Sequence, residues 1–271
     1  MSTPRDRPSV GSAPAVRRAR GLAAATALSI ALLGLASFAT AADPLVLWEI
    51  VHDQCVPNQE RHHDPQPCVR VDLSKGVSRG FAVLKDINGA TQFLLIPTRW
   101  IIGIESPLLE RPGTPNYFAA AWRARRFTEA VVGHPMARDT LSLALNSAFG
   151  RSQDQLHIHI DCVRADVRAA LRRQRFQIAR HWAPLPVLFA GHRYRALRID
   201  GATLAGHDPI KLLAWSLPRA RIKMDRYTLV VVGMQYGRVP GFAVLETRAE
   251  PRDGNRGTGE ELQDHACALS R

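Results

Sequence analysis

LALNSAFGRSQDQLHIHIDC, residues 143–162, is the stretch on which the predicted fold depends. It joins an apolar segment to a second segment, QLHIHID, in which polar and apolar residues alternate. Alternate side chains of a strand share a face, so the second segment is predicted to be a strand with one polar and one buried side. A polar row on an apolar strand is costly unless it forms a site or finds partners, so functional residues are expected here. The polar side carries Gln155, His157, His159 and Asp161.

Three hypotheses explain the two histidines of this row. The first is an exposed sheet face that happens to carry His157 and His159. The second is a metal site, because two imidazoles in a His-x-His arrangement can bind one ion, with Asp161 as a possible further ligand. The third is a histidine nucleophile acting on phosphorus. A two-histidine motif has low specificity, so its spacing alone does not decide among the three.

The rest of the chain predicts an α+β fold, in which short apolar strands form an antiparallel sheet and amphipathic helices pack on it. Asn88-Gly89 is a strong turn signal that joins the two upstream strands. Thr114-Pro115 marks the start of a helix that runs to Gly133. Residues 45–75 are expected to be irregular. Strands are expected at 81–84, 93–96, 141–145, 156–160, 227–232 and 242–245, and further helices at 164–180 and from 208 onward.

The first 42 residues are predicted to direct the chain to a membrane. Residues 1–20 form a basic tail, and residues 21–42 are uncharged and rich in Ala and Leu, which is just long enough to cross a bilayer as a helix. Arginines before this segment and Asp43 after it predict a cytoplasmic N-terminus. Residues 43–271 are then an exported domain held at the membrane by one span. The alternative is a cleaved signal peptide, because Ala39-Thr40-Ala41 resembles a processing site.

Cysteine number and spacing agree with export. An even number of cysteines in an exported chain predicts disulfides. Cys55 and Cys68 flank a short proline-bearing segment and are expected to pair, which leaves the other two cysteines to form the second bond. The alternative is a zinc site made by Cys55 and Cys68 with His62 and His63, although oxidation would compete for these thiols. The four cysteines are Cys55, Cys68, Cys162 and Cys267.

The net charge of the chain limits the kinds of binding partner that it suits. The chain carries a formal net charge of +12, and five arginines against one aspartate in residues 1–20 account for +4 of it. The remaining domain is therefore still basic and suits an acidic partner, which could be nucleic acid, an anionic lipid surface or a phosphorylated substrate. Nucleic acid is disfavoured, because no aromatic residues that could stack on bases are interleaved with the basic ones.

The stretch around the two histidines resembles the histidine-triad motif, His-φ-His-φ-His-φ-φ, preceded by a Gly-x-Ser/Thr loop. Gly150-Arg151-Ser152 matches that loop, which places Gln155 at the first motif position, His157 at the second and His159 at the third. The chain departs from the motif at Gln155, where a histidine is usual. An amide can still donate and accept hydrogen bonds.

Within that superfamily the chain is similar to the CDP-diacylglycerol pyrophosphatase family. The resemblance covers most of the chain from Cys55 onward. It rests on CVPNQ (55–59), PC (67–68), GFAVLKDINGATQFLLIPT (80–98), GIESPLL (103–109), NSAFGRSQDQLHIHIDCVRADV (146–167), GHRY (191–194) and QDHAC (263–267).

This resemblance implies a histidine-triad-like domain that hydrolyses CDP-diacylglycerol to CMP and phosphatidate in phospholipid metabolism. It also implies that residues 43–271 face the periplasm and are held at the bacterial inner membrane. His157 would be the nucleophile that forms a cytidylyl-histidine, and His159 a second catalytic residue. Water and CDP-diacylglycerol would be the substrates and the membrane lipid surface a partner, with no cofactor, protein-bound metal, nucleic acid or protein partner. The alternatives are a soluble or secreted nucleotide hydrolase or nucleotidyltransferase of the same superfamily, or a non-catalytic binding module. Substrate or phosphate contacts are expected from Gln155, Ser152, Asn146 and Arg151, and from Asp86 at the nucleotide ribose.

Overall fold

The computed structural model describes residues 43–270. In this part of the chain, ten strands form one antiparallel sheet, in the order β1-β2-β3-β5-β4-β8-β9-β7-β6, with β10 paired to β5. The strands are β1 (Arg70–Asp72), β2 (Phe81–Lys85), β3 (Phe93–Pro97), β4 (Leu141–Leu145), β5 (Ile158–Val163), β6 (Ala183–Phe189), β7 (His192–Asp200), β8 (Tyr227–Tyr236), β9 (Val239–Arg248) and β10 (Gln263–Asp264). The helices are α1 (Val46–Glu49), α2 (Val56–His62), α3 (Tyr117–Ala124), α4 (Arg126–Val132), α5 (Ala165–Gln174) and α6 (Pro209–Ser216). The predicted α+β class is confirmed.

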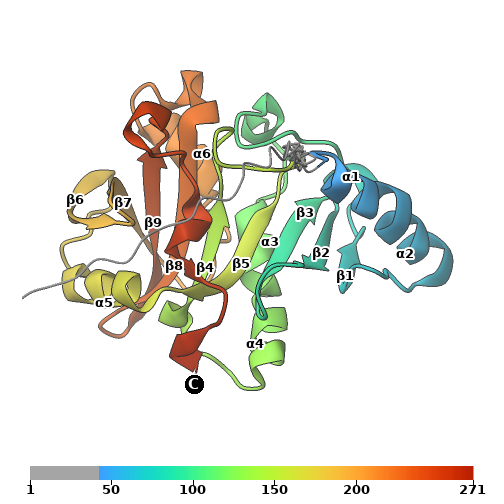
Figure 1. Cartoon of the computed structure of the whole chain (residues 1–271), viewed down its shortest axis with the longest axis horizontal. Helices are drawn as coiled ribbons and strands as arrows, with labels where there is room; N and C mark the ends of the chain where they lie inside the picture. The colour runs from blue at the N-terminus through green and yellow to red at the C-terminus, as the bar shows by residue number, and fades with distance from the viewer. Residues whose placement is uncertain (1–42, 271) are drawn as a thin grey trace, which may run out of the picture. The chain divides into compact units, whose positions relative to one another are not determined.

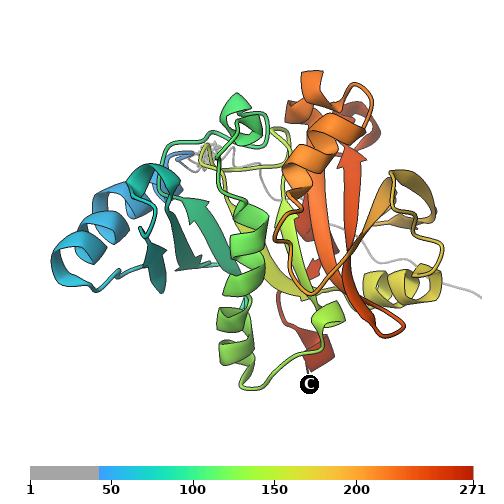
Figure 2. The same ribbon diagram turned by 180° about the vertical axis from the view of Figure 1, so that it is seen from behind.

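Helices cover both faces of this sheet. α3, α4 and α6 lie on the face that Figure 2 turns toward the viewer, while α5 lies on the other face beside β7 and β9 (Figure 1). The C-terminal segment, defined here as residues 255–267, crosses the same face as α5 and reaches β4 and β5 (Figure 1). β5 therefore lies between a layer of helices and the C-terminal segment.

The alternation predicted for β5 is present. Leu156, Ile158 and Ile160 are at most 1% exposed and pack with Phe118 and Trp122 of α3 in the larger core. Burying each of these aliphatic side chains stabilises the fold by about 1.5–3 kcal/mol. This packing fixes the strand's orientation, because a shift by one residue would exchange its two faces.

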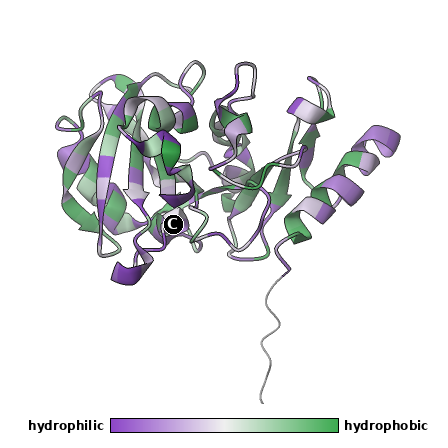
Figure 3. Ribbon diagram, turned by 90° about the horizontal axis from the view of Figure 1, so that it is seen from above, coloured by the Kyte–Doolittle hydropathy of each residue, from purple (hydrophilic) through white to green (hydrophobic). Residues whose placement is uncertain are grey.

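The prediction of irregular structure at residues 45–75 is wrong for the first part of that range. α1, a π-helical stretch (Ile50–Cys55) and α2 form one continuous helical segment, which ends at His63 with φ of 55°. Leu47 and Val51 pack against Leu94 in a core of their own on β1–β3. Figure 3 shows that this segment is hydrophobic at its start and hydrophilic toward its end.

Two other elements differ from expectation. The helix expected from Thr114 to Gly133 is divided at Arg125 into α3 and α4. The strand pair β6 and β7 was not anticipated, because Pro184 and Pro186 disfavour a strand interior. β6 tolerates both prolines because it is the last strand of the sheet and pairs only with β7.

The predicted membrane segment, residues 21–42, and the basic tail before it lie outside the described residues. Within residues 43–270, no helix is both long and apolar enough to cross a membrane.

Candidate active site

The two histidines of the motif lie side by side at the centre of the sheet. His157 immediately precedes β5 and His159 is its second residue. Their ring centroids are 4.9 Å apart, and the side chains are only 6% and 5% exposed. The hypothesis of an exposed sheet face is therefore wrong, because the C-terminal segment covers this side of β4 and β5.

The hydrogen bond of His157 determines which of its nitrogens is free. Its Nδ1 lies 2.7 Å from the backbone oxygen of Gln155. A carbonyl only accepts, so Nδ1 carries the proton and Nε2 keeps its lone pair. Burial lowers the pKa of His157, although its hydrogen bond to Gln155 and the charges of Glu260 and Asp86 act in the opposite direction. His157 is therefore neutral at pH 7, and the lone pair of its Nε2 is free.

His159 leaves its other nitrogen available. Its Nδ1 lies within hydrogen-bond distance of the side-chain amide nitrogen of Gln92 and 3.2 Å from Oε2 of Glu260. No residue between 43 and 270 is a hydrogen-bond partner of the buried Nε2 of His159. Burial, reinforced by the neighbouring His157, lowers the pKa of His159 well below 6.5. Both imidazole rings are thus neutral at pH 7.

Glu260 of the C-terminal segment completes this cluster and was missed in the sequence. Its Oε2 lies 3.2 Å from Nδ1 of His159, and its Oε1 accepts a 2.9 Å hydrogen bond from the side chain of Asn146. The amide oxygen of Asn146 in turn accepts from the backbone of Gly259 at 2.8 Å. Asn146 therefore holds the C-terminal segment against the histidines. Glu260 supplies the negative charge nearest to them.

Gln155 has a different role from the one expected. Its amide nitrogen donates to the backbone oxygens of Pro97 and Arg99 at 2.8 and 3.0 Å, and its amide oxygen accepts from the backbone of Ile101 at 3.0 Å. Both N–H groups are used, so none is left for a phosphate oxygen. Gln155 instead fixes the loop 97–101, while its own carbonyl orients His157.

The remaining predicted site residues are Arg151, Ser152 and Asp86. Arg151 is 10% exposed and forms ion pairs with Glu105 at 2.7 Å and Asp154 at 3.1 Å. Its positive charge contributes to the lowered pKa of His157, as the charge of Asp86 opposes it. Ser152 is exposed, and its side chain makes no hydrogen bond within residues 43–270. The charges of Arg151 and Asp86 therefore both act on the His157 ring.

Asp161, the last member of the polar row, links β5 to two other segments. Its carboxylate accepts from Thr91 at 2.6 Å and lies 2.8 Å from Nδ1 of His265. The bond to Asp161 is the main cause of the raised pKa of His265. The next residue, Cys162, is bonded to Cys267. Gly89, with φ of 71°, permits the close approach of His265, because a Cβ there would lie 2.6 Å from the Cβ of His265.

The described residues contain no set of ligands that fits the metal hypothesis. Across residues 43–270, no group of three or more His, Cys, Asp or Glu side chains is placed to hold a metal ion. Cys55 and Cys68, the expected thiols of the zinc alternative, are bonded to each other.

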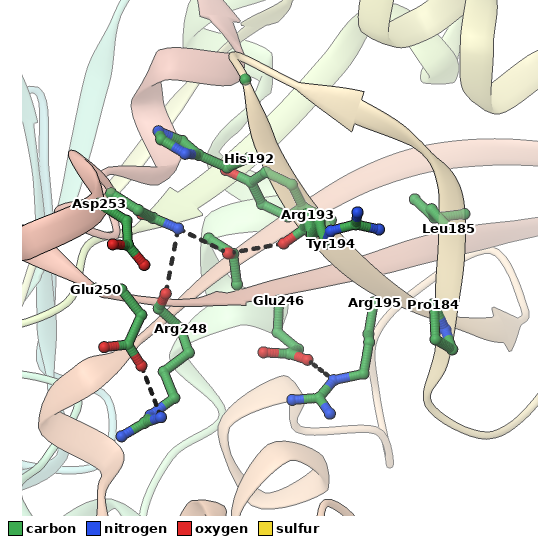
Figure 4. A pocket seen from close by; sticks show the side chains of 13 residues that line it. Pro184, Leu185, His192, Arg193, Tyr194, Arg195, Glu246, Arg248, Glu250 and Asp253 are labelled. Carbon is green, nitrogen blue, oxygen red and sulfur yellow. Dashed lines mark hydrogen bonds and ion pairs between the residues drawn. The ribbon is translucent and has the colours of Figure 1, made fainter.

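A cavity of about 480 Å³ lies away from the histidines, between β6, β7, β9 and the loop that follows β9 (Figure 4). Four of its charged side chains are paired, Arg195 with Glu246 and Arg248 with Glu250 at 2.7 Å. None of the predicted site residues lines it. The histidine cluster is identified by its chemistry and not by the size of a cavity.

Comparison with known proteins decides the family. A family model described as CDP-diacylglycerol pyrophosphatase matches residues 42–271. A CDP-diacylglycerol pyrophosphatase of Yersinia pestis is 43% identical over 223 residues, which cover 82% of this chain and 84% of that protein. The chain belongs to the CDP-diacylglycerol pyrophosphatase family. Membership in this family confirms the resemblance and the prediction that the chain is an enzyme of this class.

For this CDP-diacylglycerol pyrophosphatase family member, the burial of His157 predicts a particular pH dependence. Because burial lowers the pKa of His157 below 6.5, its neutral form should persist below pH 6.5 and be lost only as the pH falls through that lowered pKa. The pH profile of kcat/KM should therefore show an acid limb with a midpoint below 6.5. A midpoint above 6.5 would contradict the assignment.

Proposed function

We propose that this protein hydrolyses the pyrophosphate bond of CDP-diacylglycerol through a covalent histidine intermediate. The observation that carries the proposal is the hydrogen bond from Nδ1 of His157 to the carbonyl of Gln155, which leaves Nε2 unprotonated and neutral beside a second neutral histidine. A nucleophilic imidazole needs this tautomer. The family membership supports the substrate.

In this mechanism, Nε2 of His157 attacks the phosphorus that bears cytidine and displaces phosphatidate. The new P–N bond gives a cytidylyl-histidine. Water then attacks the same phosphorus, the P–N bond breaks, and CMP and one proton are released. In the tautomer protonated on Nε2, His159 donates from this unpartnered nitrogen to an oxygen of the reacting phosphate, where negative charge develops. Glu260 stabilises the positive charge that the His157 ring acquires once it is bonded to phosphorus.

We also propose that the enzyme is anchored in the inner membrane and that residues 43–271 face the periplasm. The start of the described chain supports this arrangement, because Pro44 accepts a 2.8 Å hydrogen bond from the backbone of Asp154, one residue before Gln155. An anchor that ends there would hold the active site close to its lipid-linked substrate. Two disulfides suit an oxidising compartment.

The purified protein, incubated with CDP-diacylglycerol in neutral detergent, should release CMP and phosphatidate in equal amounts. Acid-quenched samples should contain a cytidylyl-protein adduct on His157, detectable by peptide mass mapping. Release of CMP from CDP-alcohols but not from CDP-diacylglycerol would favour the alternative of a soluble nucleotide hydrolase. Binding without any turnover would favour a non-catalytic module.

Activity should survive removal of metal ions. The proposed steps use only His157, His159, Glu260 and water, so dialysis against EDTA should leave the rate of CMP release unchanged. The same dialysis applied to a known zinc hydrolase serves as the control for chelation. Loss of activity that returns on adding zinc would instead support the hypothesis that the His-x-His pair binds a metal.

A further inference from the structure

Three arginines without ion-pair partners line a second cavity, of about 280 Å³. They are Arg79 before β2, Arg99 after β3 and Arg111 after the short helix Pro107–Glu110. Within residues 43–270, none of the three guanidinium groups forms an ion pair or a hydrogen bond, and no acidic residue lines the cavity. The carboxylate of Glu110, next to Arg111, is taken by Arg221 at 2.6 Å. The lining of the cavity therefore carries three positive charges and no negative charge to balance them.

A buried hydroxyl belongs to the same cavity. Tyr117, the first residue of α3, lines it and is only 1% exposed, yet no residue between 43 and 270 is a hydrogen-bond partner of its hydroxyl. A buried hydroxyl without a partner is costly, so it indicates a site that is completed by a ligand. Burial raises the pKa of Tyr117 to about 12, although the charges of Arg99 and Arg79 oppose the shift. The hydroxyl therefore remains a donor at neutral pH.

We propose that Arg79, Arg99, Arg111 and Tyr117 form a binding site for a phosphate group, separate from the histidine cluster. Guanidinium groups bind phosphate oxygens through paired hydrogen bonds, and the tyrosine hydroxyl adds one more donor. The cavity is smaller than the about 300–1,000 Å³ of sites that enclose drug-sized ligands, which suits an anionic head group.

The site is on the opposite face of β5 from the histidines. Tyr117 and Ile101 belong to the core that contains Leu156 and Ile158, whereas the side chains of His157 and His159 alternate with these residues. The two places are nevertheless connected. The loop 97–101, whose Arg99 lines the cavity, is held by the side chain of Gln155.

The neighbouring surface favours a lipid as the source of the phosphate. Trp100 and Ile102, on either side of Ile101, are 39% and 37% exposed, and Trp48 of α1 packs edge-on against Trp100 at 5.4 Å between ring centroids. Indole rings and arginines together are typical of the lipid–water interface. A free phosphate ion would gain nothing from these apolar neighbours.

The test measures binding of two probes to the full chain in neutral detergent by calorimetry: dihexanoyl phosphatidate and inorganic phosphate. Arg79→Gln, Arg99→Gln and Arg111→Gln should each weaken binding of dihexanoyl phosphatidate by about tenfold, the effect of losing one charge-assisted hydrogen bond. Tyr117→Phe should also weaken it, and should raise the Tm of the ligand-free protein. Arg173→Gln is the matched control, because Arg173 is also exposed and is unpaired within the described residues but lies on α5.

The two probes distinguish the sources of the phosphate. If only dihexanoyl phosphatidate is bound, the site recognises a lipid head group; if inorganic phosphate binds equally well and is lost in the same variants, free phosphate is sufficient. The proposal is overturned if the three variants bind both probes as Arg173→Gln does. No turnover is measured, so absence of CMP release would leave this result unaffected.

Discussion

Replacing His157 by alanine should lower the rate of CMP release from CDP-diacylglycerol by about 10⁴-fold or more, the scale seen when an enzyme loses its nucleophile. The physical reason is that, in the proposed mechanism, Nε2 of His157 forms the bond to phosphorus. The hydrogen bond from Nδ1 to Gln155 leaves the lone pair of Nε2 free for this step. His159→Ala removes a donor to the phosphate and not the bond-forming atom, so its rate should fall less, by about 10²-fold. The measurement is the initial rate of CMP release at saturating substrate.

The His157 experiment needs a folding control. The side chain is buried, so its removal could also affect packing. Near-ultraviolet circular dichroism and the Tm should show that His157→Ala remains folded. His62→Ala serves as the matched variant, since His62 is exposed on α2 and its side chain makes no hydrogen bond within the described part of the chain. A folded His157→Ala protein that releases CMP at the rate of His62→Ala would refute the nucleophile assignment.

Local patterns predicted the central part of the fold well. The alternation in QLHIHID placed His157 and His159 on one side of β5 and its apolar residues in the core, because strand periodicity is a property of neighbouring residues. The Asn88-Gly89 signal located the turn between β2 and β3 for the same reason. These predictions depend on segments of a few residues, within which backbone geometry fixes the direction of side chains.

The same kind of pattern could not reveal the partners of the histidines. Glu260 lies about a hundred positions after His159, and nothing in the acidic pair Glu260-Glu261 distinguishes it from a solvated surface. The pairing of β10 with β5 and the hydrogen bonds of Asn146 to Gly259 and Glu260 bring it to the site. The role of Gln155 was missed for a related reason: an amide at a motif position suggests contact with substrate, whereas the backbone of loop 97–101 uses both of its donors.

Loss of the bond between Cys162 and Cys267 should have the largest effect on stability. The structure joins these two cysteines, which are 105 residues apart, and the bond holds the end of the C-terminal segment to β5. Closing so long a loop lowers the entropy of the unfolded chain and should stabilise the fold by about 4 kcal/mol in the chain-entropy model. For a domain of this size, Cys267→Ser should therefore lower the Tm by about 10 °C. Reducing agent, which opens both disulfides, should lower the Tm of the unchanged protein further.

Cys267→Ser should also lose activity below its unfolding temperature. Cys55→Ser, which removes the other disulfide, should not. Glu260 and His265 belong to the segment that Cys267 fastens, so its release loosens the contacts of Glu260 with Asn146 and His159. Cys55→Ser opens a loop of only 13 residues beside α2 and should cost about 3 kcal/mol while leaving kcat near the starting value. Thermal unfolding and CMP release, measured on both variants, give the comparison. Equal loss of kcat in the two variants, or four free thiols by non-reducing peptide mapping, would show that the C-terminal segment does not depend on this bond.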